Sequence, residues 1–380
     1  MLANIQFMIL RKLAHIIENN LFTGKAIIIL GARQVGKTTM IKNMFQNNDA
    51  LLWLNGDEID IQNLFKDMSS TRFKAIFGSK KIIVVDEAQQ IANIGLRLKL
   101  ITDILPEYQL IVTGSSSFEL ANHLNEPLTG RKWEYNLFPI SFGEMVQNHG
   151  LLEEKRLIPH RLVYGYYPEV LTQQGAEEMV LRQLSNSYLY KDILRLEQIK
   201  KPDNLIKLLQ AIAYQIGSQV SYSELSQLCG LDAKTVEKYI MVLEQSYIIF
   251  RLGSFSRNLR NELKFSRKIY FYDNGVRNVL ISNFSQIENR TDTGALWENF
   301  VISERKKYLH YNMIFPNVWF WRTKQQNEID YLEERNGKLS AYEFKWNPDS
   351  KFRKPVTFIN AYPVADFKII HRDNIETFLL

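Results

Sequence analysis

Cysteine, histidine and long apolar runs are scarce in this sequence. Cys229 is the only cysteine among 380 residues, which excludes an internal disulfide framework and favours a reducing compartment. The six histidines are scattered and include no pair at the spacing of zinc ligands. No apolar run approaches the roughly 20 residues that span a membrane, and no basic leader precedes the apolar N-terminus. We therefore expect a cytoplasmic protein without a disulfide scaffold, a zinc centre, a signal peptide or a membrane contact.

Apolar and aromatic side chains are abundant, at 46% and 12% of the residues. This content supports packed interiors and argues against disorder, and the length predicts two or three domains. The net charge is +6, and residues 251–277 alone contain seven Lys or Arg against two Asp or Glu. Aromatic residues are interleaved with these cations. The stretch therefore predicts either a surface for duplex DNA or a solvated basic hairpin.

The clearest motif begins directly after the apolar run 26–30 and fits Gly-x-x-x-x-Gly-Lys-Thr at every fixed position. It lies between a predicted buried strand and a predicted amphipathic helix, which is the context of a phosphate loop. In such a loop backbone N–H groups bind the phosphates, the lysine reaches the outer phosphates and the threonine ligates Mg²⁺. The predicted nucleotide-binding residues are Gly31, Ala32, Arg33, Gln34, Val35, Gly36, Lys37, Thr38 and Thr39. ATP and Mg²⁺ are the expected cofactors, with Thr38 as a metal ligand.

A second strand is predicted over 50–54, and a third apolar strand, over 81–85, ends in Asp86 and Glu87. This is the Walker B arrangement, in which Asp86 holds Mg²⁺ through water and Glu87 polarises the attacking water. An acidic residue at this point is also typical of a helix N-cap, so that interpretation stays open. A further strand over 109–113 ends in Ser115 and Ser116. Strands that alternate with helices predict a parallel sheet, and ligands of such sheets bind at the carboxyl ends of the strands.

At this point the chain resembles a known family. The order of phosphate loop, acidic pair and polar strand end is similar to that of AAA-type P-loop ATPases, which implies Ser115 or Ser116 as sensor 1. The segments 128–131, 137–144 and 165–168 resemble one large group of prokaryotic AAA ATPases with a C-terminal domain of unknown function. This resemblance implies Arg131 as the arginine finger, acting on a neighbouring copy if the protein is an oligomer. A structural salt bridge at a loop exit is the alternative for Arg131.

The segment 141–202 is predicted to form a helical lid, with Arg182 or Arg195 as sensor 2. Residues 203–278 then favour a winged helix-turn-helix, because short amphipathic helices precede two strands, 247–252 and 268–272, that are able to pair as a hairpin. Such a module either contacts DNA, chiefly through phosphates, or docks a protein partner. Cys229 is predicted to be a buried turn residue.

In the C-terminal segment 279–380, Asn336-Gly337 predicts a hairpin turn between two strands. Asp330 lies on the first of these strands and Glu343-Phe-Lys345 on the next, with Glu298 on the preceding helix. Together these residues resemble the core of PD-(D/E)xK nucleases. The resemblance implies Asp330 and Glu343 as ligands of a second Mg²⁺ or Mn²⁺, Glu298 as a further ligand and Lys345 as the group that orients the water. An inactive core that only retains the fold is the alternative.

The sequence thus predicts an α/β protein with four parts: a P-loop AAA-type ATPase core (1–140), the helical lid (141–202), the winged helix (203–278) and a small restriction-endonuclease-like domain (279–380). Two functions remain open. The protein is either an ATP-driven protein that acts on DNA and cuts it, or an ATP-dependent switch whose later domains only bind DNA or a protein partner.

Overall fold

The computed structural model describes residues 9–66, 69–115, 128–186, 202–256, 267–323, 327–351, 354–362 and 366–380. The chain divides into two compact units. The first unit is Met1–Pro139 with Gln245–Tyr247, and the second unit is Ile140–Glu244 with Ile248–Leu380. Among the described residues, no helix is both long and apolar enough to cross a membrane.

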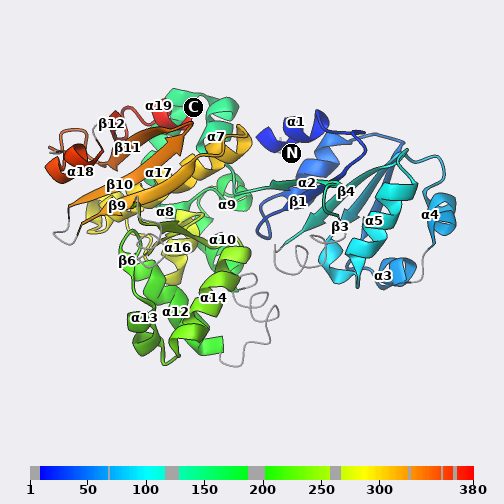
Figure 1. The fold of residues 1–380 in the computed structure, drawn as a ribbon, viewed down its shortest axis with the longest axis horizontal. Helices are drawn as coiled ribbons and strands as arrows, with labels where there is room; N and C mark the ends of the chain where they lie inside the picture. Colours follow the sequence, from blue (N-terminus) through cyan, green and yellow to red (C-terminus); the bar gives the residue numbers. More distant parts are fainter. Residues whose placement is uncertain are drawn as a thin grey trace. The chain divides into compact units, whose positions relative to one another are not determined.

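The first unit is built on a five-stranded parallel sheet in the order β2-β3-β4-β1-β5 (Figure 1). The strands are β1 (Ala26–Leu30), β2 (Leu51–Asn55), β3 (Ile82–Asp86), β4 (Gln109–Gly114) and β5 (Lys132–Asn136). Strands β1 and β3 are buried along their whole length, as expected for strands covered on both faces. The α/β class and the first four strands confirm the prediction, whereas β5 was not expected.

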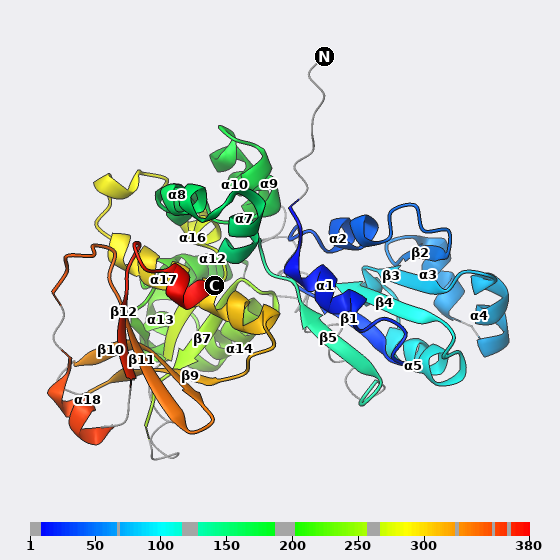
Figure 2. The same ribbon diagram turned by 90° about the horizontal axis from the view of Figure 1, so that it is seen from above.

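Helices cover both faces of this sheet. They are α1 (Lys12–Glu18), α2 (Lys37–Met44), α3 (Ile59–Lys66), α4 (Ser70–Phe77) and α5 (Ile94–Ile104), with a short 3₁₀ turn, η1 (Ala88–Gln90). Right-handed crossovers place α2 and α5 on opposite faces, because the connections through them run in opposite directions across the sheet (Figure 2). Because β1, β3 and β4 are parallel, their carboxyl ends lie at the same edge of the sheet.

The second unit begins with helices α7 (Phe142–His149), α8 (Leu151–Tyr164), α9 (Pro168–Thr172) and α10 (Glu177–Leu184). It continues with α12 (Pro202–Tyr214), β6 (Gln219–Val220), α13 (Tyr222–Cys229), α14 (Ala233–Gln245), β7 (Ile249–Gly253) and β8 (Arg267–Phe271). Strands β7 and β8 pair antiparallel, as predicted, and β6 joins β8 to give the order β6-β8-β7. Cys229 is buried, as predicted, but it is the last residue of helix α13 rather than part of a turn.

A second sheet, in the order β12-β11-β10-β9, lies in the C-terminal part of the second unit (Figure 1). Its elements and neighbours are α16 (Asn274–Leu280), η3 (Ile287–Asn289), α17 (Thr293–Tyr311), β9 (Asn317–Arg322), β10 (Glu328–Arg335), β11 (Lys338–Phe344), α18 (Val356–Ala361), β12 (Asp366–Ile370) and α19 (Glu376–Leu379). Asn336 and Gly337 both have positive φ in the β10–β11 turn, which is the hairpin signal read from the sequence. The finer division of residues 141–380 into three domains stays a prediction.

Candidate nucleotide site

The phosphate loop joins β1 to α2 through two glycines in unusual conformations. Gly31 has φ +154°, and a Cβ atom there would lie 2.1 Å from the carbonyl oxygen of Leu137. Gly36 has φ +93° and directly precedes the first turn of α2. Any other residue would therefore clash at the first position and be strained at the second. The backbone conformation of the loop therefore requires glycine at both positions.

Lys37 is folded back onto its own loop. Its Nζ donates hydrogen bonds to the carbonyl oxygens of Gly31 and Ala32, both at 2.8 Å. Burial lowers the pKa of the ammonium group to about 8, although the nearby carboxylates of Glu87 and Asp86 oppose this shift. An entering phosphate would take over these hydrogen bonds and supply the negative charge that the buried ammonium lacks.

Asp86, at the end of β3, is held between two threonines. Thr38 Oγ1 donates to Asp86 Oδ2 at 3.0 Å, and Thr113 Oγ1 donates to Asp86 Oδ1. Thr113 in turn accepts a hydrogen bond from the backbone N–H of Glu87 at 3.0 Å. Hydroxyl and carboxylate oxygens are the ligands that Mg²⁺ prefers, so Thr38 and Asp86 fit the expected ion. Sequence reasoning missed Thr113, whose position as the penultimate residue of β4 was its only signal.

Glu87 follows Asp86 in a left-handed conformation with φ 49°. Its Oε2 accepts a hydrogen bond from Gln89 Nε2 at 2.5 Å, and the same amide group donates to Ser115 Oγ at 3.1 Å. Gln89 therefore links the predicted water-activating group to the predicted sensor. Within the described residues, Gln89 Oε1 is buried without a hydrogen-bond partner. The sequence analysis did not single out Gln89, and Ser116 lies outside the described residues.

Arg11 is a further residue that the sequence analysis did not connect to the site. Its guanidinium donates to the carbonyl oxygens of Val35, within the phosphate loop, and Phe138, each at 2.6 Å. It thereby fastens the loop to the segment after β5. The remaining loop positions differ in exposure: Ala32 and Val35 are buried, whereas Gln34 and Thr39 are exposed and Arg33 is half-buried.

Arg131 lies at the opposite end of the sheet from the phosphate loop. Its carbonyl accepts a hydrogen bond from the N–H of Ala26, the first residue of β1, whereas the phosphate loop follows the last residue. Five residues of extended strand separate the two points by roughly 15 Å. The Arg131 side chain pairs with Asp103 at the end of α5. A finger role toward ATP of the same molecule does not fit this position, and a role toward a neighbouring copy stays a proposal.

The two candidates for sensor 2 stay predictions. Arg195 lies outside the described residues. Arg182 is exposed on α10 and pairs with Glu178 one turn earlier, at 2.8 Å. Such an exposed pair on one helix is an ordinary surface contact.

The basic stretch 251–277 differs from the predicted surface in an important respect. Lys268 and Arg277 are 1% and 2% exposed, and both form ion pairs with acidic groups inside the second unit. Arg251 pairs with Glu244, so its charge is compensated as well. The composition overestimated the free positive charge, because a count of residues does not reveal which cations have internal partners. Arg257, Arg260 and Lys264 lie outside the described residues.

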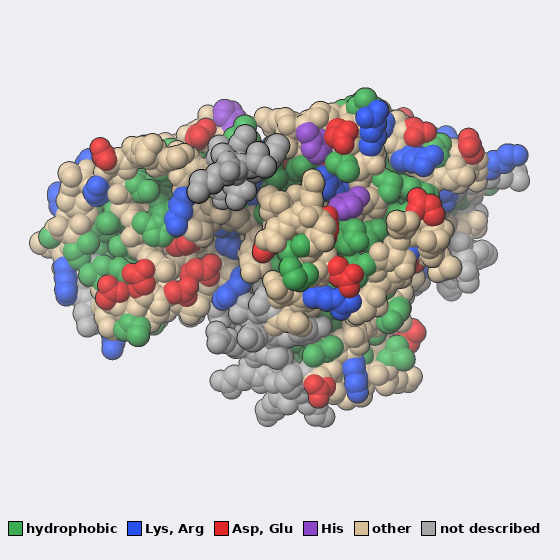
Figure 3. Space-filling model, turned by 180° about the vertical axis from the view of Figure 1, so that it is seen from behind, with side chains coloured by type: hydrophobic (Ala, Val, Ile, Leu, Met, Phe, Trp, Pro, Cys, Tyr) green, Lys and Arg blue, Asp and Glu red, His purple; other side chains and the backbone are tan. Residues whose placement is uncertain are grey.

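Figure 3 shows one face of the molecule on which the described Lys and Arg side chains are scattered among acidic ones. They do not gather into one patch on that face. A long basic groove, the usual sign of a nucleic-acid interface, is therefore not visible among the described residues on this side.

The predicted C-terminal site residues lie close together, and two lysines, Lys268 and Lys345, form hydrogen bonds with their carboxylates. Glu298 Oε1 accepts hydrogen bonds from Lys268 Nζ at 2.9 Å and from the hydroxyl of Tyr270 at 2.6 Å. Lys345 Nζ donates to Glu343 Oε1 at 2.7 Å. Burial, followed by the charges of Glu298 and Glu343, raises the pKa of Asp330 well above its usual range, and burial also raises the pKa of Glu343.

This arrangement does not fit the predicted second metal ion. In the described part of the chain, no group of three or more His, Cys, Asp or Glu side chains is arranged to hold a metal. Asp330 Oδ2 instead accepts a hydrogen bond from the backbone N–H of Phe344 at 2.8 Å. The ammonium groups of Lys268 and Lys345 donate hydrogen bonds to one oxygen each of Glu298 and Glu343. The expectation of a Mg²⁺ or Mn²⁺ ion bound by Glu298, Asp330 and Glu343 is therefore not supported.

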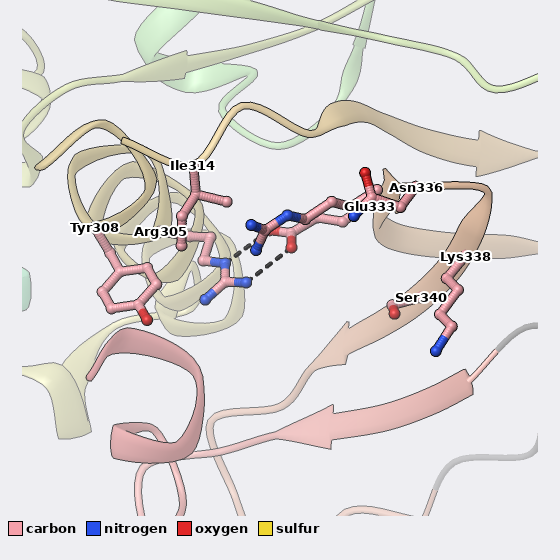
Figure 4. A pocket seen from close by; sticks show the side chains of 8 residues that line it. Arg305, Tyr308, Ile314, Glu333, Asn336, Lys338 and Ser340 are labelled. Atoms are coloured by element: carbon pink, nitrogen blue, oxygen red, sulfur yellow. Dashed lines mark hydrogen bonds and ion pairs between the residues drawn. The ribbon is translucent and has the colours of Figure 1, made fainter. Parts of the chain in front are cut away.

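A pocket of about 450 Å³ lies elsewhere in the same unit, between α17 and the β10–β11 hairpin (Figure 4). Arg305 and Glu333 form a double hydrogen bond in its wall, at 2.7 and 2.8 Å. The hairpin contributes Asn336, Lys338 and Ser340 to the lining. Of these residues, the sequence analysis singled out only Asn336, as part of a hairpin turn.

Comparison with known proteins agrees with the geometry of the first unit. Residues 23–146 match a family model described as an AAA domain. Residues 155–287 and 293–374 match models described as domains of unknown function, DUF8612 and DUF4143. The chain is 24% identical over 326 residues to an uncharacterized protein of Mycobacterium tuberculosis, covering 84% of this chain and 70% of that protein. It is 22% identical over 383 residues to an uncharacterized protein of Methanocaldococcus jannaschii, covering 95% and 82%.

Among solved structures, a Walker-type ATPase of Pyrococcus abyssi is similar with a TM-score of 0.50 and 17% identity, covering 71% of this chain and 94% of that one. At this identity the likeness concerns the fold. The AAA-domain match and the shared fold support a P-loop AAA-type ATPase, as the sequence motifs predicted.

Proposed function

We propose that this protein is an ATP-dependent molecular switch, in which the first unit binds and hydrolyses ATP and the second unit binds a partner. The observation that carries the ATPase proposal is the convergence of Lys37, Thr38, Asp86, Glu87 and Thr113 at one edge of the parallel sheet. Lys37 and Thr38 follow β1 at the start of α2, Asp86 and Glu87 lie at the end of β3, and Thr113 lies near the end of β4. Their chemistry matches what phosphoryl transfer requires: a cation for the phosphates, oxygen ligands for Mg²⁺ and a carboxylate for the attacking water.

In this proposal, the loop N–H groups and Lys37 bind the β- and γ-phosphates. Thr38 and Asp86 would hold a magnesium ion, which would offset the charge that develops on the transferred phosphoryl group. Glu87 accepts a proton from the attacking water, and Ser115 senses the γ-phosphate. Thr113 fixes Asp86 and the backbone of Glu87 in the orientation that these roles require.

Two variants of the full-length protein test the ATPase proposal. Lys37→Ala is expected to abolish ATP binding, because the loop loses the cation that faces the phosphates. Glu87→Gln is expected to bind ATP as the parent does and to lose turnover by about 10²-fold or more. Equilibrium binding of a fluorescent ATP analogue and a phosphate-release assay measure the two effects. Hydrolysis by Glu87→Gln at the parent rate would remove the water-activating role of Glu87.

The partner bound by the second unit is proposed to be duplex DNA, contacted through a winged helix at 203–278. The order α12-β6-α13-α14-β7-β8 supports this assignment, because β6 pairs with β8 and the β7–β8 hairpin follows the third helix. Helix α14 exposes Lys234, Glu237 and Lys238, which is only a weakly basic face. Any contact with DNA would therefore be mainly to phosphates.

Cleavage of DNA by a PD-(D/E)xK-like domain at 279–380 is the second candidate function. It is supported by the approach of Asp330 to Glu343 and by the pairing of Glu343 with Lys345. Incubation of plasmid DNA with the purified protein, with and without ATP and Mn²⁺, tests it. Metal-dependent cleavage that Asp330→Asn abolishes would establish the nuclease, whereas intact plasmid under all conditions favours the switch.

A further inference from the structure

Lys268 of β8 is a buried cation whose role neither the ATPase nor the winged-helix proposal explains. Its side chain is 1% exposed, and its Nζ contacts carboxylate oxygens of Glu298 on α17, at 2.9 Å, and of Glu328 on β10. The ammonium group also lies 5.5 Å from the ring centroid of Phe320. A buried ammonium group is costly unless carboxylates surround it, so its position requires these partners.

The acidic side chains around Lys268 include one of the predicted metal ligands and lie close to another. Glu298 is one of the predicted ligands, and Glu328 stands two residues before Asp330 on the same strand. Both carboxylates act on Lys268, and the charge of Asp330 is close enough to act on it as well. The ammonium group thus contacts one of the predicted metal ligands, Glu298, and the charge of a second, Asp330, acts on it.

We propose that Lys268 is the resident cation of this carboxylate cluster and takes the place of a divalent metal ion. Three cations, Lys268, Lys345 and Arg322, contact the acidic side chains Glu298, Glu328 and Glu343. These ion pairs compensate three of the four acidic side chains of the cluster, and Asp330 is the fourth. In this proposal, the C-terminal sheet needs no metal ion to offset most of its buried acidic charge.

The position of Lys268 gives the cluster a mechanical role. Lys268 belongs to the sheet β6-β8-β7, whereas its partners belong to α17 and to β10 of the C-terminal sheet. Helix α17 packs against both β8 and β11. The ion cluster therefore connects the proposed winged helix to the C-terminal segment inside the second unit.

Melting temperatures of the full-length, chelator-treated protein, with and without MnCl₂ and without nucleotide, test this proposal. The parent is expected to respond to Mn²⁺ no more than the Asp330→Asn/Glu343→Gln variant, which lacks the predicted ligands. Lys268→Met removes the internal cation, so Mn²⁺ is expected to raise its melting temperature by at least about 2 °C. Lys307→Met is the matched control, because Lys307 is equally buried and forms its ion pair with Glu304, which is not one of the predicted metal ligands. It should be destabilised without gaining a response to Mn²⁺.

Glu298→Gln gives a second test that does not depend on whether Lys268→Met folds. Without metal, this change is expected to lower the melting temperature, because Lys268 loses a carboxylate partner. A vacant metal site would behave in the opposite way, since removing one of several repelling carboxylates would stabilise it. A higher melting temperature for Glu298→Gln, a rise with Mn²⁺ in the parent that Asp330→Asn removes, or a folded Lys268→Met that ignores Mn²⁺ would each overturn the proposal.

Discussion

At the scale of single residues, the nucleotide site is defined by how each polar group is satisfied before ATP arrives. Lys37 is bonded to its own loop, Asp86 is held by two threonines and Glu87 is held by Gln89. In the proposed function, each of these contacts holds a group near the position where the reaction needs it. Catalysis would then require the exchange of only a few hydrogen bonds, which costs little reorganisation.

The lowered pKa of Lys37 predicts a pH dependence of ATP binding. The pKa of the free protein's ammonium group is about 8, and bound phosphates will raise it because they supply opposite charge. Binding is therefore strongest below pH 8, where Lys37 is charged in both states. Above pH 8 the affinity should fall by up to about tenfold per pH unit. Titration with a fluorescent ATP analogue from pH 7 to 9.5 measures this, and a flat profile would contradict it.

Gln89 is predicted to position Glu87. Because Gln89 contacts both Glu87 and Ser115, Gln89→Ala should leave ATP affinity unchanged and lower turnover by about tenfold or more. Its neighbour Gln90 is exposed, so Gln90→Ala is the matched control and should behave like the parent. Equal turnover of the two variants in a phosphate-release assay would show that the contact has no catalytic value.

At the scale of elements, the motifs that resemble the AAA group serve to join helices. Ser141 and Glu144 form a capping box at the start of α7, and Phe142 N donates to Glu304 of α17 at 2.6 Å. In the segment 165–168, a Cβ atom at Gly165 would lie 2.1 Å from the carboxylate of Asp273. These residues therefore connect the helices after the ATPase core to the C-terminal part of the second unit.

Asp273 is predicted to contribute strongly to the stability of this connection. Its carboxylate accepts N–H groups from Tyr166, at 2.6 Å, and from Val276, at 3.1 Å, where it caps α16. Asp273→Asn turns one acceptor into a donor facing an N–H group, which should cost about 1–3 kcal/mol of unfolding free energy. Asp232 caps α14 at the surface, and Asp232→Asn should cost almost nothing, because asparagine caps equally well. Urea denaturation of both variants measures the difference, and equal midpoints would contradict the prediction.

At the scale of the whole molecule, the open question is how the two units communicate with each other and with other copies of the protein. Arg131 bears on this question, because it lies far from the phosphate loop of its own first unit. An arginine that acts in trans would make hydrolysis depend on assembly. The same position is equally compatible with its salt bridge to Asp103.

Arg131→Ala decides between these roles. As a finger in trans, this variant should keep its ATP affinity and lose turnover by about 10³-fold. Mixing it with Lys37→Ala protein should then restore part of the activity, since each variant supplies the part that the other lacks. Parent-like hydrolysis by Arg131→Ala alone would leave only the structural salt bridge.

Binding of duplex DNA should depend steeply on salt if phosphates dominate the contact. For roughly five phosphate contacts, the slope of log affinity against log salt would be about −4.5. Replacing Arg257, Arg260 and Arg267 by alanine should flatten the slope by about 2.7, at about 0.9 per contact. Lys268 and Arg277 are excluded from this set because they are buried. An unchanged slope would assign the basic stretch to solvent or to a protein partner.

The sequence by itself determined where the proposed nucleotide site lies, and the physical reason is that such a site is local. A phosphate loop is made by consecutive backbone groups between a strand and a helix, and the parallel sheet brings its strand ends together by topology. Periodicity and glycine positions therefore sufficed to place Lys37, Thr38, Asp86 and Glu87. The hairpin turn at Asn336-Gly337 was predicted for the same reason.

Only the tertiary structure decided which charges are free and what they neutralise. In the sequence, Lys268 belongs to a basic stretch and Glu298 to a nuclease-like motif, yet in the fold each is the other's partner. Thr113, Gln89 and Arg11 were likewise recognisable only from the groups they contact. Composition and spacing record the charge that a residue carries, whereas burial and pairing set its energetic role. Those depend on neighbours that are distant in the chain.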